Sequence, residues 1–145
     1  MKAFIFGLML VLVSASPINA AQASVEERTR MSVSIAAYIH DFGRSSDFKT
    51  DAVELGPTAV VGNSALADWR SVDGKRHGQI SFFYLCDHWN VGKISTGQPL
   101  QAKDLVGQGL SNMSTKTATK LLADLKQFEK QHVAYLKPAH NEGSC

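Results

Sequence analysis

The chain has 145 residues, the length of one domain of ordinary size. Its 44% hydrophobic and 19% charged residues exclude an intrinsically disordered chain and predict a folded globular protein. Because 15 Lys and Arg face 13 Asp and Glu, the charge is too even for a protein that must neutralise several phosphates, and we expect no nucleic-acid partner.

Residues 1–23 have the pattern of a secretory signal peptide. Lys2 precedes an apolar run over residues 3–13, which is roughly half the ~20 residues that a membrane-spanning helix needs. Small residues follow, and cleavage is expected after Ala20 or after Ala23. The sequence therefore predicts a periplasmic or secreted protein, with no stable membrane insertion after processing.

The first expected element is a helix that begins at Ser24. Ser24 and Glu27 have the spacing of a capping box, in which the hydroxyl accepts a backbone N–H bond and the Glu reaches back to the cap. Apolar residues then recur on one helical face, which we expect to pack in the core, and Gly43 offers a stop. These apolar residues are Met31, Ile35, Tyr38, Ile39 and Phe42.

Short antiparallel strands are expected next, at residues 52–55, 58–61, 64–70, 78–86 and 89–94. Turn-forming pairs stand between them: Gly56-Pro57, Gly62-Asn63, Asp73-Gly74 and Asp87-His88. Residues 80–85 are nearly all apolar, which predicts a central strand covered on both faces. The strands should form a four- or five-stranded meander.

Two helical segments follow the strands. A short helical turn is expected at residues 101–106, and a long helix should be capped by Ser111 or Ser114. The long helix carries one apolar stripe: Ala118, Leu121, Leu122, Leu125, Phe128, Val133 and Leu136. The order helix, strands, helix predicts a single α+β domain over residues 24–137, with the last helix packed on the sheet and a polar tail at residues 138–145.

Cys86 and Cys145 remain after processing, in a compartment that permits disulfides. Pairing of Cys86 with Cys145 would tether the polar tail to the central strand. The rival interpretation is a buried Cys86 with a free C-terminal thiol. A third is a soft-metal site, because Cys86 and His88 would share one face of a strand and Cu(I) accepts thiolate and imidazole ligands. His77 and Met113 are the more distant candidates for a further ligand.

The chain has no G-x-S-x-G or H-E-x-x-H motif, and we expect no enzymatic activity. Trp69 and Trp89 are predicted to seal the core rather than to stack on a ligand. The helix followed by a curled sheet is also similar to cystatin-like and NTF2-like domains, a likeness that suggests a small apolar ligand. A cavity lined by Tyr38, Phe82 and Tyr84 would favour that alternative.

Several segments between residues 60 and 129 resemble the copper uptake system-associated proteins, which are small secreted proteins of bacteria. The resemblance rests on residues 60–69 (VVGNSALADW), Gly78-Gln79, Trp89-Asn90-Val91, residues 105–109 and residues 118–125. It implies a non-enzymatic accessory protein near periplasmic copper trafficking, with copper-handling proteins as partners. It assigns a ligand role to no residue.

Overall fold

The computed structural model describes residues 21–42, 47–50, 52–107 and 112–139. In chain order the elements are α1 (Val25–Phe42), β1 (Val53–Val61), β2 (Ser64–Ser71), β3 (His77–Leu85), β4 (His88–Ile94), α2 (Ala102–Leu105) and α3 (Thr115–Glu129). The predicted α+β class is confirmed. Within the described ranges no helix is both long and apolar enough to cross a bilayer.

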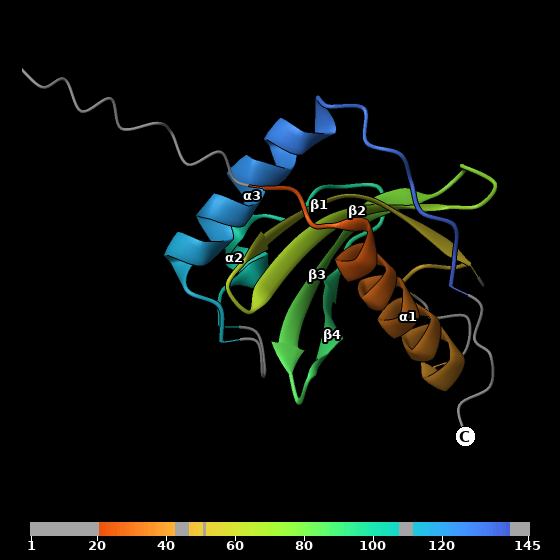
Figure 1. Ribbon diagram of the computed structural model, residues 1–145, viewed down its shortest axis with the longest axis horizontal. Coiled ribbons are helices and arrows are strands. Elements are labelled where there is room, and N and C mark those ends of the chain that lie inside the picture. Colours follow the sequence, from red (N-terminus) through yellow and green to blue (C-terminus); the bar gives the residue numbers. More distant parts are fainter. Residues whose placement is uncertain (1–20, 43–46, 51, 108–111, 140–145) are drawn as a thin grey trace, which may run out of the picture.

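The four strands form one antiparallel sheet in the order β1-β2-β3-β4, so the expected meander is present with four strands (Figure 1). The prediction of two strands separated by a Gly56-Pro57 turn is wrong, because β1 runs through both residues. Leu55 pairs with Trp69 and Thr58 pairs with Ala67. Gly56 and Pro57 therefore stand opposite Asp68 alone, as in a β-bulge.

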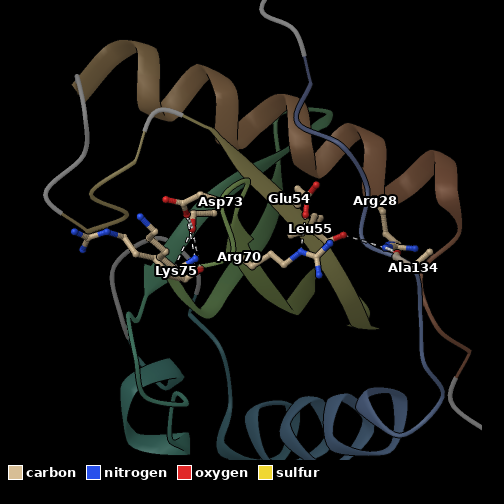
Figure 2. A network of polar contacts seen from close by, with 9 residues as sticks. Arg28, Glu54, Leu55, Arg70, Asp73, Lys75 and Ala134 are labelled. Carbon is tan, nitrogen blue, oxygen red and sulfur yellow. Dashed lines mark hydrogen bonds and ion pairs between the residues drawn. The ribbon is translucent and has the colours of Figure 1, made fainter.

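Because of the bulge, β1 residues before and after it that would share a face by simple alternation instead face opposite sides of the sheet. Leu55, before the bulge, belongs to the hydrophobic cluster beneath α1, whereas Ala59, after it, belongs to the cluster beneath α3. Helix α1 covers one face of the sheet and α3 covers the other, so the sheet is the middle of three layers (Figure 2). Most of β2 is consequently buried on both faces, and so are residues 79–82 of β3. The prediction that both faces are covered over residues 80–85 holds only for residues 80–82, because Phe83 and Tyr84 are partly exposed and Leu85 is 45% exposed.

The helix starts follow the sequence closely. Ser24 Oγ accepts the Glu27 N–H at 3.1 Å, and Ser114 Oγ accepts the Thr117 N–H at 3.2 Å. Ser111 and Gly43 lie outside the described residues. Two expectations are wrong: Phe42 is 70% exposed, and α3 ends at Glu129, so Val133 and Leu136 are not part of its stripe.

Segments from both ends of the chain cover the outer edge of β1. Ala23 N–H donates to the Thr58 carbonyl at 3.1 Å, and Leu136 and Leu55 exchange two backbone hydrogen bonds of 2.8 and 3.2 Å. We call residues 131–139 the strap, because they run from the end of α3 past β1 to α1 (Figure 1). Ala139 N–H donates to Ser32 Oγ of α1 at 3.2 Å, which fastens the far end of the strap.

Arg28 of α1 holds the strap from inside the protein. Its side chain is 4% exposed, and its Nη2 donates to the carbonyls of Leu55, at 3.0 Å, and Ala134, at 2.6 Å (Figure 2). Burial lowers the pKa of this guanidinium, and its Nε finds no hydrogen-bond partner among the described residues. Carbonyl dipoles from β1 and the strap therefore offset the charge.

Both tryptophans are structural, as predicted. Trp69 is fully buried and Trp89 is 4% exposed. Trp69 packs edge-on against Phe48, with ring centroids 5.0 Å apart, and its Nε1–H donates to the Ser95 carbonyl at 3.0 Å. Each ring thus joins a strand of the sheet to the core beneath α1.

Candidate functional site: an aromatic groove beside α1

A cavity of about 760 Å³ forms a groove between α1 and the β3–β4 hairpin. Its helical side is built from residues that recur every three or four positions on α1, which places them on one face of the helix. These are Arg30, Val33, Ser34, Ala37, Tyr38, Asp41 and Phe42. The hairpin supplies the opposite side, including Tyr84, Trp89 and Val91.

Aromatic rings dominate the groove. Tyr84 meets Trp89 edge-on at 5.2 Å between centroids, and Tyr38 lies 4.8 Å from Phe42. Tyr38 and Tyr84 therefore line a cavity between helix and sheet, as the small-ligand hypothesis requires. Phe82, the third residue named in that hypothesis, is instead 1% exposed and belongs to the core.

Hydrogen bonds fix the groove in shape. Ser34 Oγ donates to the Trp89 carbonyl at 2.5 Å, which joins the two sides directly. The Tyr38 hydroxyl donates to Asp47 Oδ2 at 3.1 Å. Burial and the neighbouring Asp47 carboxylate raise the pKa of Tyr38, so this hydroxyl stays a donor at neutral pH. Ionisable groups stand at the rim, where Arg30 forms an ion pair with Glu26 at 2.7 Å.

His88 lines the groove, whereas Cys86 lies in the turn just before β4, in a position that differs from the prediction. Cys86 is not on a strand: Cys86 and Asp87 form the two-residue turn between β3 and β4, with φ of 54° and 63°. Both left-handed conformations are those of a type I′ turn. The His88 Nδ1 donates to the Cys86 carbonyl at 2.8 Å, which leaves Nε2 as its available ligand atom.

Cys86 is exposed, so the interpretation of a buried thiol is wrong. Cys145 lies outside the described residues, and its pairing with Cys86 stays a prediction. Across the described part of the chain, no three His, Cys, Asp or Glu side chains come close enough together to hold a metal ion. His77 lines a cleft away from this turn, and Met113 is buried beneath α3, so neither supplies the missing ligand.

A second, smaller cleft of about 340 Å³ lies between the β2–β3 hairpin, the end of α3 and the strap. Its ionisable residues include Asp68, Arg70, Glu129 and Tyr135. Burial and the adjacent Glu129 carboxyl raise the pKa of Asp68 to about 7. Burial and the Asp68 charge also raise the pKa of Tyr135. Sequence reasoning missed this cluster, because its members are far apart in the chain and form no motif.

Comparison with known proteins adds no relative: no family model, no curated protein and no solved structure matches this chain. The resemblance to copper uptake system-associated proteins therefore remains a prediction. A function must be inferred from the groove, the Cys86–His88 turn and the cleft themselves.

Proposed function

We propose that the protein is a non-enzymatic binding protein, and that its groove between α1 and the β3–β4 hairpin holds a small amphipathic molecule with an apolar or aromatic body. The observation that carries this proposal is the cavity of about 760 Å³ lined by Tyr38, Tyr84 and Trp89. Ligand sites of small molecules are concave, predominantly apolar and typically ~300–1,000 Å³.

The groove offers the two kinds of contact that such a ligand needs. Tyr84 presents an aromatic wall to the groove, and the buried Trp89 holds the Tyr84 ring edge-on from the core side. A ring held in this way loses little conformational entropy on binding. Val33 and Phe42 are large apolar side chains that remain exposed, and both line the groove. A ligand that covers them removes apolar surface from water, which contributes roughly 25 cal/mol per Å².

Polar groups at the rim favour a ligand with a polar end. Arg30 stands on α1, and Asp87 and His88 stand on the hairpin turn. An amphipathic molecule can bury its apolar part against the aromatic wall while its polar end stays at this rim in contact with water. A purely hydrocarbon ligand would leave these polar groups without any role in binding.

The test is titration of the secreted protein with 8-anilinonaphthalene-1-sulfonate, a fluorescent molecule with an aromatic body and one charged end. We expect saturable binding of one molecule per chain. Ala37 lines the groove and is exposed, so Ala37→Trp should fill the groove and weaken binding at least tenfold without unfolding α1. Tyr84→Ala should weaken binding by removing the aromatic wall that the hairpin presents to the groove.

The matched control is Ala123→Trp, which places the same ring at an exposed position of α3, on the other face of the sheet. This variant should bind the dye as the unmodified protein does. Non-saturable binding, or equal affinity in Ala37→Trp and Ala123→Trp, would refute the groove as the ligand site.

Copper binding through Cys86 and His88 is the second candidate, supported by an exposed thiol and an imidazole two residues apart on one tight turn. A further ligand would have to come from a partner protein or from residues outside the described ranges. Thiol counting on denatured, unreduced protein decides whether Cys86 is free. Competition titration with a Cu(I) chelator should then show weaker binding in both Cys86→Ser and His88→Ala, and unchanged binding in Cys145→Ser.

A further inference from the structure

The cleft beneath the end of α3 holds a carboxyl group that faces another carboxyl group. Asp68 projects from β2, opposite the bulge in β1, and lines the same cleft as Glu129, the last residue of α3, whose carboxyl is close enough to raise the pKa of Asp68. Gln79 Oε1 accepts the Leu100 N–H at 2.8 Å, so its Nε2 is the end that points to Asp68 Oδ1, at 3.3 Å. One oxygen of Asp68 thus has a fixed donor, and the carboxyl also meets Glu129.

The other charged groups around the cleft do not neutralise this pair. Arg70 of β2 is engaged by Glu54 of β1 at 2.5 Å (Figure 2). The Arg70 guanidinium also lies 4.1 Å from the centroid of the Tyr135 ring. His77 at the start of β3 lines the cleft but is exposed to water. Among the described residues of this cluster, the Arg70 guanidinium is thus paired with Glu54, and no ion pair joins it to Asp68 or Glu129. A proton between Asp68 and Glu129 relieves the excess negative charge.

We propose that Asp68 and Glu129 form a proton-operated latch: with one proton between them they fasten the end of α3 to β2 and hold the strap on β1, and loss of that proton loosens both. When protonated, Asp68 donates a hydrogen bond to Glu129. When it is ionised, two carboxylates face each other in a partly buried cleft, where repulsion is stronger than in water.

The strap lies directly on this cluster. Tyr135 packs against the backbone of Gly56 in the bulge, where a Cβ would come within 2.5 Å of the ring. Its ring is covered by Arg70, and the next residue, Leu136, pairs with Leu55. Because Tyr135 follows Glu129 by six residues, a displacement of the end of α3 pulls on the segment that carries these contacts.

The direction of the pH effect follows from the Asp68 pKa, which burial and Glu129 raise from 3.8 to about 7 in the closed state. When the latch is open, Asp68 is in water and its pKa returns toward 3.8. The closed state thus binds more protons than the open state between these two values. The latch weakens as pH rises from about 4 to about 7, and it does not change further above that range.

Hydrogen exchange tests the latch at the Leu136 amide, which donates to the Leu55 carbonyl in the strap. Protection factors, corrected for intrinsic exchange, should fall roughly tenfold or more between about pH 5 and about pH 7, because one linked proton changes an equilibrium at most about tenfold per pH unit. Asp68→Asn keeps the shape and can donate its amide N–H to Glu129, so its protection should stay high at every pH. Glu129→Gln removes the repulsion but leaves Asp68 buried, so the slope should become shallower without disappearing.

Asp87→Asn is the control, since it removes an exposed carboxyl from the distant β3–β4 turn and should retain the slope of the unmodified protein. A pH-independent Leu136 protection factor in the unmodified protein would overturn the latch. So would an unchanged slope in Asp68→Asn or in Glu129→Gln. If either variant proves unstable, a carboxyl-carbon NMR titration of the unmodified protein decides, because an Asp68 midpoint near its ordinary value is incompatible with the latch.

Discussion

Gly78→Ala tests how closely the segment after β4 approaches the sheet. A Cβ at Gly78 would lie 1.9 Å from the Ser95 carbonyl oxygen and 3.0 Å from Trp69 Nε1. Both neighbours are constrained: the Ser95 oxygen belongs to the backbone, and the Trp69 ring is fully buried. The overlap can therefore be relieved only by moving the segment at residues 95–97 away from β3.

The free-energy cost of that movement follows from the hydrogen bonds that it breaks or stretches. Ser95 would lose the 3.0 Å bond from Trp69 Nε1, and its own N–H bond to the Gln79 carbonyl, now 2.8 Å, would be stretched. The 2.8 Å bond from Gly97 N–H to the His77 carbonyl would be strained as well. At roughly 1 kcal/mol net for each bond, plus the penalty for a buried indole N–H without a partner, we expect a loss of ~2–4 kcal/mol.

Urea denaturation at neutral pH measures this loss, and Gly74→Ala is the matched control. Gly74 has a φ of +70°, and a Cβ added there would meet no described atom within 4 Å. Alanine at this position therefore carries only the cost of a left-handed backbone, about 1–2 kcal/mol. Gly78→Ala should exceed it. If Gly78→Ala is no more destabilising than Gly74→Ala, the close approach of Ser95 to β3 is wrong.

Single residues carry three further predictions. Trp69→Ala should lower the free energy of unfolding by ~3–5 kcal/mol in a denaturant titration, and a loss well under 1 kcal/mol would contradict its buried position. Cys86→Asn should raise the free energy of unfolding by ~0.5–1 kcal/mol, because Asn tolerates the positive φ of a type I′ turn better than Cys does. A lower free energy of unfolding in this variant would show that the thiol stabilises the turn. Signal cleavage should follow Ala20, because Gln22 bridges Ala59 and Ala23 is buried on β1. An intact mass that begins at Ser24 would contradict this choice.

Local chemistry predicts the ends of most elements in this chain. Ser24 and Ser114 cap their helices because a side-chain oxygen satisfies first-turn amides wherever the sequence places it. Gly62-Asn63 turns the chain between β1 and β2 for a similarly local reason, since Gly62 adopts a φ of 58°. The groove was also partly foreseeable, because Tyr38 has the helical spacing of α1 and Tyr84 the alternation of β3.

The bulge in β1 was not foreseeable from local chemistry. Gly56-Pro57 is a turn former by composition, and only pairing with β2 decides that the strand continues past it. Val133 and Leu136 also continue the apolar spacing of α3, and this spacing wrongly predicts that the helix extends past Glu129. Leu136 instead pairs with Leu55, a long-range contact that the spacing of apolar residues cannot reveal.

The sequence places Asp68 on a buried face of β2 but does not predict the ionisation of its carboxyl group. Alternation along β2 places Leu66 and Asp68 on the same face of the sheet, and Leu66 lies in the core beneath α3. An Asp in that register is unusual, because a carboxylate is expensive to bury without a cation. The ionisation of Asp68 depends on which side chain of α3 lies over its carboxyl group. The sequence does not show that the end of α3 places Glu129 there rather than a lysine. With Lys126 or Lys130 in that place, the same Asp68 would form an ion pair and its pKa would fall. The position of the last turn of α3 therefore determines whether β2 carries an ion pair or a shared proton.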